Sequence, residues 1–114
     1  MDDCIFCTIA AGKMDADILY DDDEVIAFRD INPQAPVHFL VVPKRHIVSA
    51  LDLTHDDAGL IYKIFDVVRK VAEAEDIAAS GMRILTNVGR AAGQIVLHLH
   101  FHVLGGRRLH WPPG

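Results

Sequence analysis

The sequence predicts a small α+β domain, with an antiparallel sheet of about five strands, one long helix and one short helix. Short segments rich in β-branched and aromatic residues lie on either side of a single long amphipathic stretch. Near the C-terminus, residues 98–104 read His-Leu-His-Phe-His-Val-Leu, an alternation that is typical of a strand. We expect residues 1–114 to form one domain, because 114 residues is close to the common domain size.

The first half of the chain predicts a short helix followed by three strands. Residues 5–11 place their apolar side chains on one side of a helix, which a glycine then ends. Residues 18–20 and 24–29 are extended in character, and the three aspartates between them favour a solvated hairpin turn over a cation site. Residues 38–42 are dense in β-branched and aromatic side chains and predict a central strand that ends at Pro43.

The second half predicts the long helix and two further strands. Thr54 and Asp57 have the spacing of a capping box, and the helix after them is expected to run to about residue 79. We expect its apolar stripe to cover one face of the sheet, with a partner-binding surface as the alternative. Residues 82–86 predict a strand, and a glycine-containing loop over 87–94 leads into the histidine segment.

Composition narrows the class of protein. Hydrophobic residues make up 51% of the chain and charged residues 24%, as in soluble globular proteins. A formal net charge of −5 disfavours nucleic acid and membrane surfaces as partners, since both require basic patches. No apolar run approaches the roughly 20 residues that cross a bilayer, and the acidic N-terminus does not resemble a secretory signal. We therefore expect a cytoplasmic protein.

Three histidines dominate the candidate chemistry. In a strand, His98, His100 and His102 lie in a row on one face, and Leu97 and the alternate apolar residues after it lie on the core face. Neutral imidazole is a nucleophile near neutral pH, and its protonated form is a good acid. Imidazole is also a common transition-metal ligand. The segment alone is consistent with a catalytic row and with a zinc site.

Cys4 and Cys7 form a Cys-x-x-Cys pair near the N-terminus. A structural disulfide is disfavoured in a reducing compartment. A thioredoxin-like redox motif would need a strand before the first cysteine, and the chain has no room for one. Two free thiols and half of a zinc site both remain open.

Several motifs together resemble the histidine-triad (HIT) superfamily. Gly93-Gln94 followed by the histidine segment looks like the signature of that superfamily. Residues 27–38, Ala-Phe-Arg-Asp-Ile-Asn-Pro-Gln-Ala-Pro-Val-His, and residues 42–46, Val-Pro-Lys-Arg-His, resemble its nucleotide-pocket segments. The C-terminal residues 105–114, which end in Trp-Pro-Pro-Gly, are similar to the tail of the Hint branch, the histidine-triad nucleotide-binding proteins. The match covers nearly the whole chain.

The resemblance implies a fold, an assembly and an activity. It implies a HIT-like fold and a homodimer whose two sheets join into one continuous sheet. It also implies a hydrolase that cleaves phosphoramidates of purine nucleoside monophosphates, AMP or GMP joined to an amine, without a cofactor. His100 corresponds to the nucleophile, which forms a covalent nucleotidyl-histidine intermediate. His102 would contact the phosphate or the leaving group, and His98 would support the row.

The same resemblance assigns a nucleotide pocket. Asp30 matches the carboxylate that accepts hydrogen bonds from the ribose hydroxyls, and His38 matches a binding position. Asn87 and the backbone that follows Gly93 would hold phosphate oxygens, and apolar residues would enclose the base. The expected nucleotide-binding residues are Ile5, Phe6, Ile9, Phe28, Asp30, Ile31, His38, Leu40, Asn87, Gly93, Ile95 and Val96.

The sequence departs from the family at Ile95. Hint proteins usually carry a serine or threonine there, whose hydroxyl helps to hold the phosphate or the leaving group. A hydrogen bond to a charged group is worth about 1.5–3 kcal/mol. A slower or differently selective enzyme is therefore expected, and Ile95→Ser is expected to raise turnover of an adenosine phosphoramidate.

The resemblance also bears on metal binding and on alternative functions. Some bacterial members with a similar Cys-x-x-Cys pair bind structural zinc, and the matching residues here are Cys4, Cys7, His46 and His98. In that case His98 is structural, and the chemistry belongs to His100 and His102. The alternatives are a dinucleoside polyphosphate hydrolase of the wider superfamily, a nucleotide-binding or scaffold protein with weak residual hydrolysis, and a protein that binds metal through the three histidines.

Overall fold

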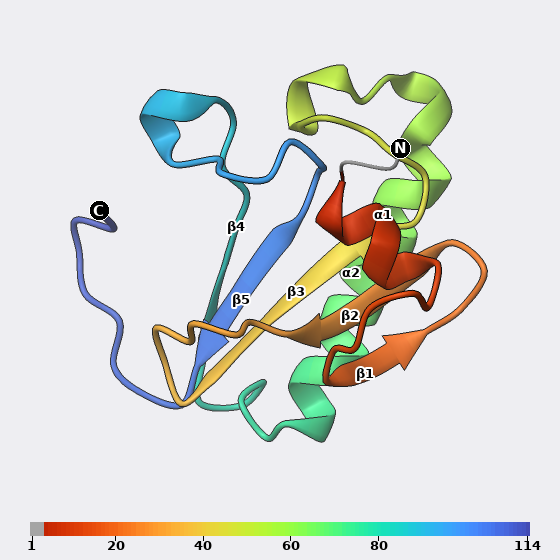
Figure 1. Cartoon of the computed structure of the whole chain (residues 1–114). Coiled ribbons are helices and arrows are strands. Elements are labelled where there is room, and N and C mark those ends of the chain that lie inside the picture. The colour runs from red at the N-terminus through yellow and green to blue at the C-terminus, as the bar shows by residue number, and fades with distance from the viewer. Residues whose placement is uncertain (1–3) are drawn as a thin grey trace.

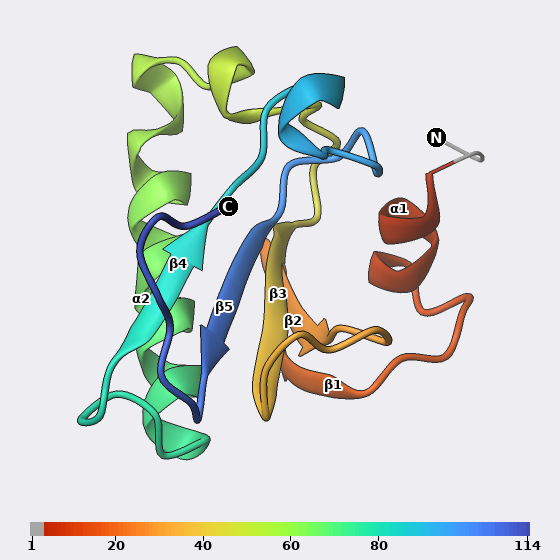
Figure 2. The same ribbon diagram turned by 90° about the vertical axis from the view of Figure 1, so that its left-hand side faces the viewer.

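The computed structural model describes residues 4–114. A five-stranded antiparallel sheet in the order β1-β2-β3-β5-β4 carries one helix on each face (Figures 1 and 2). This arrangement confirms the predicted α+β class, with one long helix and one short one. The elements are α1 (Ile5–Ala10), β1 (Ile18–Asp21), β2 (Val25–Arg29), β3 (Val37–Pro43), α2 (Ala58–Ala74), β4 (Met82–Leu85) and β5 (Phe101–Gly105).

The central strands β2 and β3 bury both of their faces, so they consist almost entirely of apolar residues. One set of alternate side chains packs under α2 and forms the larger core. The other set faces α1 and forms a second, smaller cluster. The larger core includes Val25, Ala27, Phe39, Val41, Val68, Leu99, Phe101 and Val103, and the smaller cluster consists of Phe6, Ile9, Ile26, Phe28, Leu40 and Val42. The capping box of Thr54 and Asp57 is present in a 3-10 turn immediately before α2.

Helix α2 ends at Ala74, five residues before the predicted end near residue 79. The chain adopts a left-handed conformation at Asp76, with φ of +61°. The N–H of Ile77 then donates to the carbonyl of Ala72, and the N–H of Asp76 donates to Glu73. This is the Schellman pattern of helix termination, and aspartate is one of the few residues other than glycine that tolerates it. The prediction took the following glycine as the end of the helix and missed this turn.

Strand β5 begins at Phe101, whereas the sequence predicted a strand from residue 98. Pairing with β3 stops at the pair Val41–Phe101. Pro43 lies further along β3 and has no N–H to donate, so the ladder cannot continue toward His98. Leu97 was predicted to face the core but is 59% exposed, because the chain has left the sheet at this point.

None of the helices in residues 4–114 combines the length and the apolar character that a membrane crossing requires.

Candidate active site

A pocket of about 580 Å³ opens on the face of the sheet that carries α1. Helix α1, the loop after it, strands β2 and β3, and the loop before β5 all contribute to its lining. The twelve residues that the resemblance assigns to nucleotide binding all line this pocket, together with His100 and His102. The structure therefore brings into one cavity residues that lie far apart in the sequence.

His100 presents a free ring nitrogen to this pocket. Its Nδ1 lies 2.7 Å from the backbone carbonyl of His98, and because a carbonyl only accepts, Nδ1 carries the proton. Within the described residues, Nε2 has no hydrogen-bond partner. Every fully buried side-chain nitrogen or oxygen there has one, so Nε2 is not fully buried. Because His100 lines the pocket, we infer that Nε2 faces the cavity. Burial lowers the pKa of His100, partly offset by the hydrogen bond to His98, and keeps the ring neutral near pH 7.

The irregular segment before β5 is held by specific hydrogen bonds in place of the sheet ladder. The N–H of Leu99 donates to the carbonyl of Ile47 at 2.6 Å. The hydroxyl of Thr86, at the exit of β4, donates to the carbonyl of His100 at 2.8 Å. The backbone that positions the histidine rings is thus fixed on both sides of His100.

His102 lies at the end of a chain of hydrogen bonds that determines its tautomer. The backbone N–H of Gln34 donates to Nδ1 of His38 at 3.0 Å, so the proton of a neutral His38 is on Nε2. That Nε2–H donates to Nδ1 of His102, also at 3.0 Å. His102 therefore carries its own proton on Nε2. Burial, together with the neighbouring rings of His100 and His38, lowers the pKa of His102 to about 4.

Asp30 completes this group. Its Oδ1 accepts the N–H of Asn32 at 2.8 Å, and its Oδ2 lies 3.4 Å from Nε2 of His38. Asp30, His38 and His102 offer three potential metal-ligand atoms within 4.8 Å of one another. Because the Gln34 N–H keeps the proton on the ring nitrogen of His38 that faces the other two groups, the geometry favours hydrogen bonding over metal coordination.

The loop before β5 is anchored by a buried glutamine. The side-chain oxygen of Gln94 accepts the N–H of Gly89 at 2.9 Å, and its amide nitrogen donates to the carbonyl of Val48 at 2.6 Å. Gly93 adopts the left-handed conformation, with φ of +91°, which a side chain would disfavour. These contacts hold the loop against the pocket, and Ile95 and Val96 follow in its lining.

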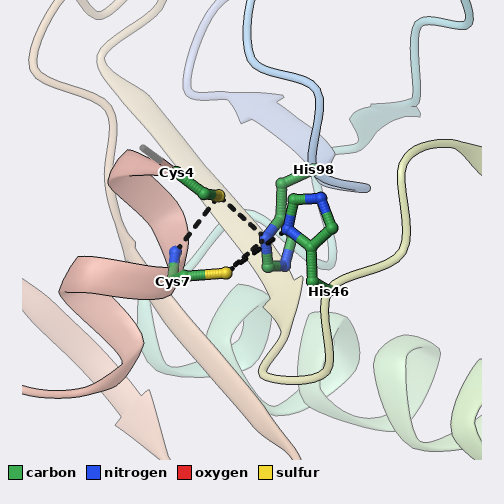
Figure 3. Close-up of side chains that lie close together, drawn as sticks. All are labelled: Cys4, Cys7, His46 and His98. Carbon is green, nitrogen blue, oxygen red and sulfur yellow. Dashed lines mark hydrogen bonds between the residues drawn. The ribbon is translucent and has the colours of Figure 1, made fainter. Parts of the chain in front are cut away.

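His98 is located apart from the pocket, in a cluster with both cysteines and His46 (Figure 3). Its ring is fully buried, and its Nε2 donates to the carbonyl of Pro43 at 2.7 Å. Its Nδ1 lies 3.2 Å from Sγ of Cys4 and 3.5 Å from Sγ of Cys7, and Sγ of Cys7 lies 3.3 Å from Nδ1 of His46. The side chain of His98 thus faces the cysteines, and only its backbone carbonyl contacts His100.

The donor set of this cluster suits zinc. Two thiols and two imidazoles are a closed set for a tetrahedral ion, which would hold sulfur and nitrogen about 3.6 Å apart. The second nitrogen of His98 donates to a backbone carbonyl, as metal-bound histidines usually do. Burial raises the pKa of the Cys7 thiol, with a further contribution from Cys4, so two thiolates here would need a compensating cation.

Six lining residues were not predicted from the sequence. Three of them form the loop between α1 and β1, and the others flank Asp30 or lie just before β3: Met14, Asp15, Ala16, Arg29, Asn32 and Gln34. Loop residues show no periodicity, so no sequence pattern indicates that they line a cavity. Gln34 contributes through its backbone N–H, which every residue except proline offers.

A family model described as the HIT domain matches residues 11–109. The chain belongs to the HIT family. An uncharacterised HIT-like protein of Synechococcus elongatus is 46% identical over 113 residues, which span 99% of this chain and 98% of the relative.

Solved HIT structures agree closely with this fold. A HIT family hydrolase from Legionella pneumophila is 45% identical with a TM-score of 0.96, and the match covers 98% of this chain and all of that one. A HIT family hydrolase from Clostridium thermocellum is 44% identical with a TM-score of 0.94, with 96% of both chains covered. A histidine triad protein from Clostridium difficile is 42% identical with a TM-score of 0.92, again over 96% of both chains.

The low pKa of His102 predicts a pH-dependent stability. Between about pH 4 and 6.5, an unfolded His102 binds a proton that the folded ring, facing His38, His100 and Asp30, does not. The free energy of unfolding should therefore fall as the pH drops through this window and level off above it, with a slope of at most about 1.4 kcal/mol per pH unit from this residue. Urea unfolding of the wild type and of His102→Asn, at several pH values, measures the slope.

We expect a shallower slope for His102→Asn, because the variant lacks this titrating group. His55→Asn, a change at an exposed histidine outside the pocket, serves as the control and should reproduce the wild-type slope. Equal slopes in all three proteins would contradict the low pKa of His102.

Proposed function

We propose that this HIT protein is a hydrolase of the Hint branch that cleaves the P–N bond of purine nucleoside phosphoramidates. The observation that carries this proposal is the pair of opposite tautomers in one pocket. His100 presents an unprotonated Nε2, and His102 carries its proton on Nε2. A nucleophile beside a hydrogen-bond donor to the leaving nitrogen suits displacement of an amine from phosphorus. The hydrolases among the similar structures support the same class of reaction.

The nucleotide would occupy the rest of the pocket. The apolar side chains of Phe6, Phe28 and Leu40 would enclose the base. Asp30 lies at the pocket with its side chain 18% exposed and has lone pairs free for the ribose hydroxyls. Asn87 and the backbone of the anchored loop from Gly93 to Val96 would hold the phosphate oxygens.

The first step forms a bond between Nε2 of His100 and phosphorus. The P–N bond to the amine breaks, and its electron pair goes to the amine nitrogen, which accepts a hydrogen bond from Nε2–H of His102. That nitrogen takes a proton from water, which leaves a hydroxide ion for the second step. The carbonyl of His98 stabilises the positive charge that develops on the ring of His100, since it accepts the Nδ1 proton. The product of this step is a nucleotidyl-histidine and a free amine.

The second step returns the enzyme to its starting state. The hydroxide ion formed in the first step attacks phosphorus, and Nε2 of His102 keeps its proton. The bond between phosphorus and His100 breaks, and its electron pair returns to Nε2. The nucleoside monophosphate leaves, and both histidines are in their original tautomers. No cofactor is needed, because every proton and electron pair is supplied by substrate, water and the ring of His100.

His100→Ala tests the proposed nucleophile. We expect wild-type protein to hydrolyse adenosine 5′-phosphoramidate to AMP, and the variant to lose at least about a thousandfold in kcat, since no other group forms the covalent intermediate. Turnover is measured by chromatography of AMP, and mass spectrometry of acid-quenched protein should show one adenylate group on the wild type and none on the variant.

His55→Ala is the matched control and should retain the wild-type rate, since His55 is exposed and does not line the pocket. Nucleotide binding without turnover in the wild type would favour a binding or scaffold protein. Faster cleavage of a dinucleoside polyphosphate than of the phosphoramidate would favour the other branch of the superfamily.

We also propose that Cys4, Cys7, His46 and His98 hold a structural zinc ion. The four ligand atoms converge from α1, from the segment after β3 and from the segment before β5 (Figure 3). An ion there would link the N-terminal helix, which forms one wall of the pocket, to the backbone that orients His100. With four protein ligands, zinc has no open position, so its role is structural.

Metal analysis tests this site. Protein purified without chelator should contain about one zinc per chain, and Cys7→Ser should contain little, because the ion loses a thiolate ligand. Thermal unfolding of the wild type should shift to lower temperature when a strong chelator removes the metal. Metal-free wild-type protein, or zinc retained by the Cys7→Ser variant, would contradict the assignment.

We propose that a second copy of the chain pairs along β4. The two edge strands of the sheet, β1 and β4, differ in how well they are suited to pair with a strand of another copy. The edge strand β1 has an irregular register between Ile18 and Tyr20 and leads into three aspartates, and both features discourage pairing. Strand β4 pairs regularly with β5, and no other described strand covers its outer edge. A continuous sheet across two copies would give hydrogen-bond partners to the backbone N–H and C=O groups along that edge.

Two matched substitutions test this pairing. Ile84 on β4 is 37% exposed and Ile18 on β1 is 42% exposed, so each offers an exposed isoleucine on an edge strand. We expect the wild type to sediment as a dimer and Ile84→Lys to shift toward monomer, because the new charge would be buried between copies. Ile18→Lys should remain dimeric. A monomeric wild type, or equal behaviour of the two variants, would contradict pairing through β4.

A further inference from the structure

Isoleucine 95 lies almost uncovered at the active-site pocket. Its side chain is 91% exposed, although it lines the same cavity as His100 and His102. Ile5, Met14 and Ile31 are also exposed apolar side chains of this lining. Fully exposed isoleucine loses the free energy that burial of its apolar surface would bring, and a bound ligand is what can cover it here.

The direction of the Ile95 side chain is set by its neighbours. Gln94 is buried and hydrogen-bonds to Gly89, Val48 and Val96, which fixes the backbone on both sides of Ile95. Val96 turns inward and packs against the cluster below α1. Ile95 therefore projects outward from a fixed backbone, and its position at the pocket does not depend on a flexible loop.

The remaining question is which part of a substrate meets Ile95. The nucleoside side of the pocket is formed by α1, β2 and the start of β3, where Phe6, Phe28 and Asp30 lie. With phosphorus at Nε2 of His100, the lining outside this nucleoside side includes His102, Asn87, Gly93 and Ile95. His102 is the hydrogen-bond donor to the leaving amine, so the substituent of that amine lies on the same side.

We propose that Ile95 makes the leaving-group side of this pocket apolar and so selects phosphoramidates whose amine carries an uncharged aliphatic chain. The proposal rests on the proposed function and names its substrate class. An aliphatic chain gains free energy by covering the isoleucine, whereas ammonia is too small to reach it and a cationic chain would have to give up hydration beside it. The site selects through the substituent beyond the P–N bond.

Three AMP amides separate the effect of an aliphatic chain on the amine from the effect of a charge on that chain. Their amines are ammonia, n-butylamine and 1,4-diaminobutane attached through one nitrogen, so the last two differ chiefly by a terminal charge. We expect wild-type kcat/KM for the butyl amide to exceed that for the aminobutyl amide by about tenfold, the range that one apolar contact gives. Ile95→Ser should bring this ratio close to one and raise turnover of the ammonia amide, because its hydroxyl can hydrogen-bond near the phosphate. Comparing variant with wild type cancels the intrinsic reactivity of each amide.

Leu97→Ser is the matched control. Leu97 follows two residues later, is 59% exposed and does not line the pocket, so its loss should leave the ratio unchanged. An equal butyl-to-aminobutyl ratio in the wild type and in Ile95→Ser, with activity retained, would overturn the inference and leave the proposed function standing.

A binding measurement covers the case in which no amide is turned over. Calorimetry with His100→Ala, and with the His100→Ala/Ile95→Ser double variant, gives the affinities of the same butyl and aminobutyl amides without chemistry. We expect about a tenfold preference for the butyl amide in the first protein and none in the second. Identical preferences would refute the role of Ile95 whatever the reaction is.

Discussion

The hydrogen bond from Nδ1–H of His100 to the carbonyl of His98, 2.7 Å long, is the constraint on which the proposed chemistry depends. It places the proton of His100 on the nitrogen that faces the protein and leaves the other nitrogen free for the substrate. A carbonyl is a reliable partner for this purpose, because it has no alternative protonation state. Its position is fixed in turn by the ring of His98, which is buried and hydrogen-bonded to Pro43.

Proline 43 explains why this constraint exists. A regular strand would use the carbonyl groups around His98 and Pro43 in the ladder between β3 and β5. The missing N–H of proline ends the ladder at Val41, and the polar groups beyond it find other partners. The carbonyl of Pro43 accepts from the ring of His98, and the carbonyl of His98 accepts from His100. A local break in the sheet thus supplies the acceptors that fix both tautomers.

Burial then sets the protonation state of the histidine groups. Desolvation lowers the pKa of each of His38, His98, His100 and His102. Neutral rings can donate with one nitrogen and accept with the other, so they form directed chains, whereas charged rings only donate and would repel one another. The nearby carboxylate of Asp30 opposes the shift at His38, His100 and His102 but does not reverse it.

The sequence alone predicts much of the fold, because periodicity reports burial. The apolar stripe of α2 and the dense apolar strands β2 and β3 follow from residues that must leave water. Alternation also predicts correctly that Leu99 and Val103 are buried on the face opposite His100. Backbone geometry is harder to predict from the sequence. The left-handed turn at Asp76 and the early end of β5 pairing produce no periodic pattern of apolar residues.

The residues of the candidate site also differ in how far the sequence alone predicts them. The histidines stand out in the sequence because three of them alternate in one short segment. The proposed nucleotide pocket, by contrast, follows from resemblance to a family, since an apolar residue such as Leu40 is indistinguishable from a core residue until its neighbours in space are known. Neither the sequence pattern nor the family resemblance indicates that the loop before β1, with the exposed Met14, lines the pocket. The role of Gln34 is not predicted either, because this residue acts through its backbone N–H, which does not depend on the type of side chain.

Residues of the site that are buried and hydrogen-bonded tolerate substitution poorly, whereas exposed residues at the rim of the pocket can be replaced at little cost in stability. Replacement of His98 or of the buried Gln94 would break hydrogen bonds that position the proposed catalytic rings or the loop, at a cost to folding as well as to the proposed chemistry. Replacement of Ile95 changes an exposed side chain, and exposed positions usually alter stability by less than about 0.5 kcal/mol. Under the proposed function, relatives can therefore share the reaction and differ in the amine they release. The rim of the pocket, rather than its histidines, is where the substrate of an individual HIT protein has to be sought.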